Sequence, residues 1–291
     1  MRKPLFLGPG VAVVTPFLLD GEIDYFHFVN LVGELQGDGA KALALCSSTG
    51  ESELLSTREK IKLIGIGAHL APHLPILCGA SGCNTSRLIE ECILLYKAGA
   101  DAFLVTPPYY VRPTFDGILG HYTAFADKVQ APIIIYNVPS RTGIDLSVEQ
   151  ICQLAQATGA IGLKDCNADP SRIMQIKGKL GEEFAVYCGE DSLLLPYLYA
   201  GASGAISAAG NVMCKTLVQI CTSFANGDYS AATERYRVYY SACKALFSKP
   251  NPVLVKGVLA DQDKICRGYR LPMTICCDRK ITQLIEQIEQ A

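Results

Sequence analysis

Short apolar runs alternate with amphipathic segments from near the start of the 291-residue chain to about residue 225. Each run is followed by a stretch with apolar residues every three or four positions, as in LIEECILLYKAGA, which is typical of a surface helix. We expect the runs to be buried strands, and they are VAVVTPF (11–17), ALALCSS (42–48), LPILCGAS (74–81), AFLVTPP (102–108), APIIIYNVP (131–139), AIGLKDC (160–166), FAVYCGE (184–190) and GAISAAG (204–210).

A strand–helix unit repeated about eight times at this spacing predicts an α/β fold of the (β/α)8, or TIM, barrel type. A doubly wound parallel sheet is the alternative, but no G-x-G-x-x-G follows any of the runs, which disfavours it.

The pattern changes after residue 225, where the apolar runs stop and three helices are expected. The first covers 228–247 and the last begins near DRKITQLIEQIEQ. Between them, in KPNPVLVKGVLADQ, Asn251 is expected to cap a helix and Pro252 to be its first residue. We therefore expect a barrel domain over residues 1–225 and a C-terminal helical extension over residues 226–291.

Composition narrows the class of protein. A hydrophobic content of 49% with 19% charged residues suits a compact soluble enzyme, and a net charge of −2 gives no reason to expect nucleic acid or an anionic membrane as a partner. No apolar stretch reaches the roughly 18 residues of a membrane span, and MRKPLFLGPG has too short an apolar core for a signal peptide. We expect a cytoplasmic protein.

The 13 cysteines form no C-x-x-C pair, and the four histidines have no companion cysteines at zinc-ligand spacing. Cys46, Cys78 and Cys188 lie inside apolar runs, where a free thiol behaves as a small hydrophobic group. We expect reduced, buried thiols and no metal site.

Lys164 stands at the end of AIGLKDC, and functional residues of (β/α)8 barrels gather at the C-terminal ends of the strands. Its parity with Gly162 predicts that both face the barrel interior, with the glycine leaving room beside the lysine, while Ile161 and Leu163 face the helices. Burial lowers the pKa of an amine, and a neutral amine can form a Schiff base with a ketone. An ion pair with Asp165 at the barrel rim is the alternative.

Other strand ends supply polar groups that could act with this lysine. Tyr136 ends the preceding strand on an interior parity and is a candidate proton donor and acceptor. The hydroxyls of Ser48 and Thr49, with the backbone N–H groups around Gly50, could hold a small carboxylate, although a turn with a helix cap is an alternative. Arg141 could bind a second carboxylate or be a solvated surface arginine.

The motifs STGES, YNVPSRTG and GLKD, at these spacings, resemble the lysine-dependent class I pyruvate aldolases, the superfamily of dihydrodipicolinate synthase and N-acetylneuraminate lyase. The resemblance runs from GVAVVTPF to YRLPMT, and NVPSRTG and RLPMT are closest to the synthases. It implies that Lys164 is the Schiff-base lysine and that Tyr136, Ser48 and Tyr110 form a proton relay, with Tyr110 reaching across a subunit interface. It also implies that Thr49 and the backbone of Ile206 contact pyruvate. Arg141 would contact the carboxylate of aspartate semialdehyde.

This resemblance implies a lyase that condenses pyruvate with L-aspartate 4-semialdehyde in the diaminopimelate route to lysine, without a metal or other cofactor. It also implies a homotetramer, built as a dimer of dimers, or a homodimer. Another pyruvate aldolase, which cleaves a sialic acid or a 2-keto-3-deoxy sugar acid, is one alternative, and a barrel that binds a keto acid without turnover is a second. Ser47 and Ser48 depart from the glycine and threonine that are usual in the synthases.

The same resemblance bears on regulation by free lysine. Thr57, Lys60 and Leu88 stand where lysine-sensitive members carry histidines and a glutamate. We therefore expect lysine to inhibit weakly or not at all, with Glu53 as the nearby carboxylate that could replace the missing charge.

Overall fold

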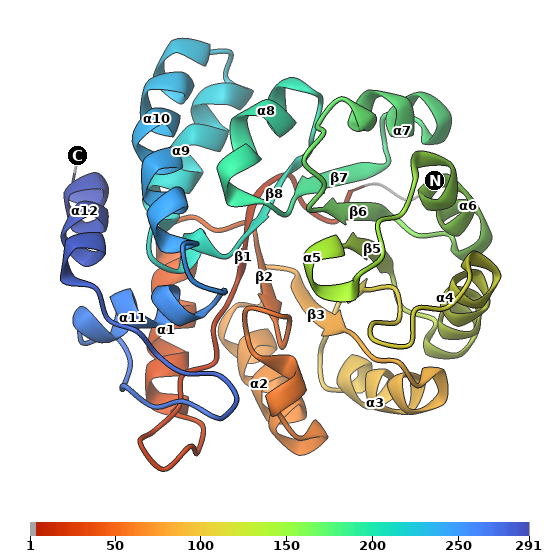
Figure 1. Ribbon diagram of the computed structural model, residues 1–291, viewed down its shortest axis with the longest axis horizontal. Helices are drawn as coiled ribbons and strands as arrows, with labels where there is room; N and C mark the ends of the chain where they lie inside the picture. The colour runs from red at the N-terminus through yellow and green to blue at the C-terminus, as the bar shows by residue number, and fades with distance from the viewer. Residues whose placement is uncertain (1–3, 291) are drawn as a thin grey trace.

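Eight parallel strands close into a barrel in the computed structural model, which describes residues 4–290 (Figure 1). Each strand pairs with the next along the chain, and β8 pairs with β1 to close the ring. The strands are β1 (Gly8–Ala12), β2 (Ala42–Leu45), β3 (Ile76–Ala80), β4 (Ala102–Val105), β5 (Ile133–Asn137), β6 (Gly162–Asp165), β7 (Ala185–Cys188) and β8 (Gly204–Ser207). The predicted (β/α)8 barrel is confirmed.

Helices surround the barrel and follow the eight strands in turn. They are α1 (Tyr25–Gly37), α2 (Thr57–Leu70), α3 (Thr85–Lys97), α4 (Phe115–Val129), α6 (Val148–Thr158), α7 (Arg172–Leu180), α8 (Leu194–Tyr199) and α9 (Cys214–Ala225). Short helical turns precede four of these helices: η1 (Ser52–Leu54), α5 (Pro139–Thr142), η2 (Asp191–Leu193) and η3 (Ala209–Asn211). Within residues 4–290, no helix combines the length and the apolar character that crossing a bilayer would require.

The three helices expected after residue 225 are present as α10 (Tyr229–Leu246), α11 (Val253–Asp261) and α12 (Arg279–Gln290), on the side of the barrel where α9 and α1 lie (Figure 1). The predicted cap of α11 was wrong. Pro252 occupies the cap position without a side-chain hydrogen bond, and the Asn251 amide instead reaches Thr49 in the barrel, with Nδ2 2.9 Å from Oγ1. The boundary at residue 225 stays a prediction.

The first strand begins earlier than its apolar run suggests. The run covered 11–17, whereas β1 covers Gly8–Ala12 and includes Pro9 and Gly10, two residues that are uncommon in strands. Val13 and Val14 remain buried, but Pro16 has no N–H to continue a ladder, and the Val14 N–H donates to the side chain of Asn211. Hydrophobicity therefore marked burial here rather than strand pairing.

Alternation along the strands separates the barrel interior from the layer under the helices. Tyr136, Tyr187 and Ile206 belong to the interior cluster, and Leu163 packs with the helices as expected. Ile161 was assigned to the helix side, but it packs in the interior cluster. It precedes Gly162, the first residue of β6, so the two-residue period of the strand does not apply to it.

All thirteen cysteines carry free thiols, as expected, but not all are buried: Cys83 is exposed and Cys166, Cys266, Cys276 and Cys277 are partly buried. Cys46, Cys78 and Cys188 are buried, and burial raises the pKa of each thiol because the thiolate is poorly solvated there. These residues fill the core as small apolar groups.

Candidate active site

Lys164 and Tyr136 face one another across neighbouring strands inside the barrel. They are register partners on β6 and β5, and Lys164 Nζ lies 4.4 Å from the centre of the Tyr136 ring. Lys164 is only 3% exposed. The structure thus brings together the two residues for which the sequence analysis predicted a shared role.

The room beside Lys164 comes from Gly189, not from Gly162 as predicted. A Cβ on Gly189 would lie 3.1 Å from Lys164 Cε and 2.6 Å from Cys166 Sγ. A Cβ on Gly162 would instead meet the backbone oxygen of Ala185, at 2.6 Å. Gly162 therefore permits the close approach of β6 and β7, while Gly189 leaves the lysine free to turn.

The Tyr136 hydroxyl lies 3.4 Å from Ser48 Oγ, and either oxygen can be the donor. Burial raises the pKa of Tyr136 because it disfavours the phenolate, while the charge of Lys164 and the Ser48 hydroxyl act in the opposite direction. Burial also raises the pKa of the nearby Cys166 thiol to about 12. Tyr136 is therefore protonated at neutral pH and can donate a proton to a substrate oxygen.

Asp165 does not pair with Lys164, which contradicts the rim ion pair considered as an alternative. Its buried carboxylate accepts a hydrogen bond from Asn137 Nδ2 at 2.8 Å and lies 3.5 Å from Arg172 Nε. Burial raises the pKa of Asp165, with Arg172 opposing that shift. Successive residues of a strand point to opposite faces, so Lys164 and Asp165 serve different sides of the barrel wall.

The loop after β2 carries Ser48, Thr49 and Gly50. Thr49 is buried, and its Oγ1 accepts the hydrogen bond from Asn251 Nδ2. A Cβ on Gly50 would lie 3.0 Å from the backbone oxygen of Val13, so this glycine allows the loop to pack closely on the segment after β1. The alternative role of these residues as a helix cap is excluded, because Ser56 caps α2.

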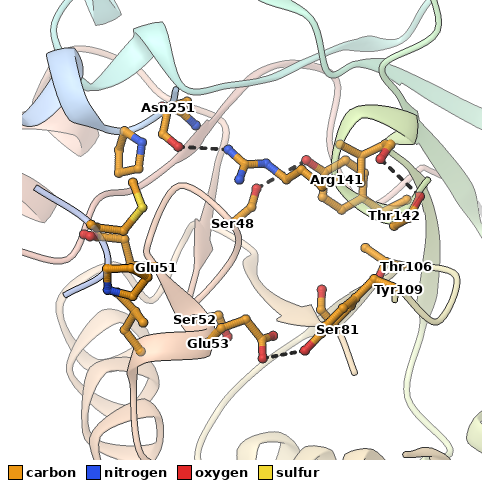
Figure 2. Close-up of a pocket in the computed structure, with 16 residues that line it drawn as sticks. Ser48, Glu51, Ser52, Glu53, Ser81, Thr106, Tyr109, Arg141, Thr142 and Asn251 are labelled. Atoms are coloured by element: carbon orange, nitrogen blue, oxygen red, sulfur yellow. Dashed lines mark hydrogen bonds between the residues drawn. The ribbon is translucent and has the colours of Figure 1, made fainter. Parts of the chain in front are cut away.

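Arg141 lies on α5 at the mouth of the barrel. Its side chain is exposed and extends toward Asn251, where Nη2 donates to the backbone oxygen at 2.9 Å (Figure 2). Asn251 therefore contacts Arg141 through its backbone and Thr49 through its side chain. The sequence analysis missed this link because it assigned Asn251 to a helix cap.

Two adjoining cavities meet at the mouth of the barrel and share Ser48, Tyr136, Val138, Arg141 and Asn251 in their walls. The larger, of about 560 Å³, contains Lys164, Thr49, Cys166 and Ile206. The smaller, of about 290 Å³, is drawn in Figure 2 and extends to Ser81, Thr106, Glu53 and Tyr109. The residues predicted for pyruvate thus line the larger cavity, and Arg141 stands where the two meet.

Asp191 fixes the segment that follows Ile206. Its carboxylate accepts the backbone N–H groups of Ala208 and Ala209, both at 3.0 Å, and the Tyr239 hydroxyl at 2.9 Å. The sequence analysis did not include Asp191, although its place just beyond the end of β7 is a signal of the same kind as the one that indicated Lys164.

Tyr110 does not reach Lys164 within its own chain. It is 90% exposed and has a left-handed backbone with φ of 66°. Its neighbour Tyr109 lines the smaller cavity and donates to Glu53 Oε2 at 2.7 Å (Figure 2). The role of Tyr110 in a neighbouring subunit stays a prediction.

Lys60 and Leu88, two positions that the sequence analysis compared with lysine-sensitive members of the family, are both buried. Lys60 Nζ lies 2.9 Å from Glu91 Oε2, and Thr57 donates to the other oxygen of Glu91 at 2.8 Å. Burial favours a lower pKa for Lys60, but the hydrogen bond and charge of Glu91 outweigh it and raise the pKa. This cation therefore already has its partner.

Asp24, His27 and Cys266 form one group whose ligand atoms lie within 4.8 Å of one another, away from the two cavities. Asp24 caps α1 by accepting the His27 N–H, and its other oxygen lies 2.6 Å from His27 Nδ1. The contacts between Asp24 and His27 are those of a helix cap. Cys266 is distant from both in the sequence, so the group could not be predicted from sequence spacing.

The chain is similar to known proteins over nearly its whole length. The family model described as "Dihydrodipicolinate synthetase family" matches residues 5–291. A 4-hydroxy-tetrahydrodipicolinate synthase of Nitrosococcus oceani is 36% identical over 288 residues, which are 98% of each chain. The dihydrodipicolinate synthase structure from Aquifex aeolicus has a TM-score of 0.91, 34% identity and 98% coverage of both chains. A chloride-inhibited dihydrodipicolinate synthase from Acinetobacter baumannii, solved with pyruvate, has a TM-score of 0.91, 32% identity and 98% coverage of both chains.

Proposed function

The chain belongs to the dihydrodipicolinate synthetase family, and on this premise we propose that it condenses pyruvate, held as a Schiff base on Lys164, with L-aspartate 4-semialdehyde. The activity is that of a 4-hydroxy-tetrahydrodipicolinate synthase, a Schiff-base-forming lyase of the diaminopimelate and lysine pathway. The observation that carries the assignment of residues is the buried Lys164 Nζ beside the ring of Tyr136, within a cavity that also contains Thr49 and Ile206.

Lys164 forms the first covalent intermediate. In its unprotonated form the amine attacks the ketone carbon of pyruvate, a carbon–nitrogen bond forms, and the ketone oxygen leaves as water. The resulting imine lies inside the barrel, where Lys164 is nearly fully buried and lines the larger cavity. Pyruvate fits this step because its ketone is adjacent to a carboxylate that the loop after β2 can bind.

Tyr136 moves the protons of this step. It delivers a proton to the departing oxygen, and its phenolate then accepts a proton from the pyruvyl methyl group, which gives the enamine and restores the hydroxyl. Its raised pKa keeps the hydroxyl protonated, and Ser48 Oγ is 3.4 Å away as the next member of a relay. Tyr110 of a neighbouring subunit completes that relay in our proposal, which accounts for its exposure within a single chain.

Thr49 and the backbone around Ile206 hold the pyruvate carboxylate. Both line the cavity that contains Lys164. In this proposal the N–H groups of Thr49 and Gly50 add donors for an anion. Asn251 orients the Thr49 hydroxyl by donating to it, which leaves that hydroxyl's own proton available for a carboxylate oxygen.

Arg141 binds the carboxylate of aspartate semialdehyde. The enamine carbon attacks the aldehyde, a carbon–carbon bond forms, and the substrate amine then closes the ring and displaces Lys164. A guanidinium at the junction of the two cavities places the second carboxylate at a fixed distance from the imine. Because pyruvate binds covalently first, we expect ping-pong kinetics.

A coupled assay tests this function. The purified chain is supplied with pyruvate and aspartate semialdehyde, and in parallel with N-acetylneuraminate and a 2-keto-3-deoxy sugar acid. Condensation of the first pair, with no cleavage of the other two, supports the proposal. Faster cleavage of a sugar acid would favour a different pyruvate aldolase, and imine formation without turnover of any substrate would favour a binding protein.

We further propose the setting in which the reaction takes place. Residues 1–225 form the catalytic barrel, and residues 226–291 form an extension that contributes Asn251 to the site. The enzyme works in the cytoplasm as a homotetramer or a homodimer, since Tyr110 requires a second copy to reach a site. In this proposal the reaction uses groups of the protein and of the two substrates, without a metal or other cofactor.

A further inference from the structure

The C-terminal extension makes three polar contacts with the loop that carries Ser48 and Thr49. Asn251 Nδ2 donates to Thr49 Oγ1 at 2.9 Å. Lys256 Nζ lies 2.8 Å from Glu51 Oε2, and Arg270 Nη1 donates to the backbone oxygen of Leu54, also at 2.8 Å. Three successive parts of one loop are therefore held by residues about 200 positions away along the chain.

The contact between Lys256 and Glu51 is a buried ion pair. Their side chains are 2% and 3% exposed, and Lys256 Nζ also lies 4.3 Å from the centre of the Phe17 ring. Burial lowers the pKa of Lys256 and Arg270 adds to this effect, while Glu51 opposes it. Apolar residues of similar size often give equal or greater stability than a buried pair, so stability alone does not explain this one.

Glu51 sits at the point where the loop turns back. Its backbone is left-handed, with φ of 55° and ψ of 40°, which is uncommon for a residue with a side chain. Its N–H donates to the Ser48 oxygen at 3.2 Å, and the next N–H, of Ser52, donates to the Ser47 oxygen at 3.2 Å. The position of the Glu51 side chain is thus linked directly to the turn that contains Ser48 and Thr49.

We infer that Lys256 is a positioning residue for pyruvate capture, because by holding Glu51 it fixes the turn that directs Ser48 toward Tyr136 and Thr49 toward the pyruvate carboxylate. The inference rests on the proposed function and extends it to α11. Lys256 does not touch substrate in this account. It acts through the shape of the loop, and its loss should affect the first substrate far more than the second.

Lys256→Met tests the inference, since methionine keeps much of the side-chain length but removes the charge. We expect the KM for pyruvate to rise and borohydride trapping of the imine to slow, each by about ten- to a hundredfold, as for other displacements of positioning groups. The KM for aspartate semialdehyde should change less than threefold. Lys264→Met is the matched control, because Lys264 pairs with Glu34 at 2.6 Å in an exposed position of the same extension, and it should behave as wild type.

Lys256→Met leaves Glu51 buried without a partner, which can destabilise the fold. The double variant Lys256→Met/Glu51→Gln removes both charges and separates the two effects. We expect its melting temperature to return toward that of wild type while trapping of pyruvate stays slow. A folded double variant with wild-type trapping would overturn the inference, and so would a double variant that fails to fold, because the pair would then be structural.

The wild-type arm of the same experiment distinguishes this result from failure of the proposed function. If wild type forms no trapped adduct on Lys164, the proposed function is wrong. If wild type forms the adduct and the variants match its rate and its KM for pyruvate, only the role of Lys256 is wrong.

Discussion

Tyr136 and Lys164 are register partners on adjacent parallel strands, with the lysine Nζ 4.4 Å from the centre of the phenol ring. The ladder between β5 and β6 therefore fixes their separation, and no mobile loop has to bring them together. A rigid support of this kind suits a proton donor that must meet each intermediate formed on the lysine.

The second-substrate role of Arg141 predicts a selective kinetic defect. Arg141→Ala removes a charge-assisted contact worth roughly 1.5–3 kcal/mol, or about ten- to a hundredfold in affinity. The loss should appear in the KM for aspartate semialdehyde, while pyruvate trapping continues. Arg279→Ala, on the exposed start of α12, is the control. Loss of trapping in Arg141→Ala would show that this residue serves pyruvate instead.

Tyr110 should make activity depend on assembly, because its exposed side chain lies outside the site of its own chain. Tyr110→Phe and Lys164→Ala should each be nearly inactive alone. After subunit exchange, some sites combine an unsubstituted Lys164 from one subunit with an unsubstituted Tyr110 from the other, so activity should return. If mass spectrometry verifies the exchange and no activity returns, Tyr110 acts within its own chain or not at all.

Free lysine should inhibit weakly. Lys60 is paired with Glu91, and the apolar side chain of Leu88 gives no counter-charge for an added ammonium group. An unpaired buried ammonium costs several kcal/mol, which exceeds the roughly 4 kcal/mol binding energy of a millimolar inhibitor. The measurement is a lysine titration of the initial rate at subsaturating pyruvate. Half-inhibition below about 1 mM would mean that Glu53, which accepts from Tyr109, supplies the missing charge.

His121 should make the fold sensitive to mild acid. Burial lowers its pKa from 6.5 to about 4, so the unfolded chain binds a proton that the folded chain does not between these values. This contribution is fully present above pH 6.5 and is lost as the pH falls toward 4, and it amounts to roughly 3 kcal/mol. We measure the free energy of unfolding with denaturant at pH 7 and pH 5. It should be lower at pH 5 in wild type and in His73→Gln, but should not show this decrease in His121→Gln. If His121→Gln shows the same decrease in the free energy of unfolding as wild type, the pH dependence belongs to other groups.

The sequence predicted the barrel and most of the site because both follow from periodicity. Apolar runs marked the strands, and residues in the last part of a run or just beyond it, such as Thr49, Tyr136 and Lys164, line the cavities. Parity placed Lys164 and Tyr136 on the interior face of adjacent strands, and both stand near the C-terminal ends of their runs, where the structure shows them as register partners. The resemblance of the motifs to the aldolases added the remaining roles.

Contacts between distant parts of the chain could not be predicted in this way. Asn251 was assigned to a helix cap because local rules see only its neighbour Pro252, whereas its amide binds Thr49, 202 residues away. Gly189 leaves room for Lys164 from just beyond the end of β7, where no local signal indicates it. The ion pair of Lys256 and Glu51 likewise joins residues that are far apart in the sequence, and no local pattern predicts it.

Trapping with pyruvate and borohydride tests the central claim most directly. Reduction of the imine should add the mass of one reduced pyruvyl group to the peptide that contains Lys164, and Lys164→Arg should fold normally but show no added mass, because arginine does not become a neutral nucleophile. An adduct on any other lysine, or no adduct on wild type under conditions in which it turns over pyruvate, would contradict the mechanism.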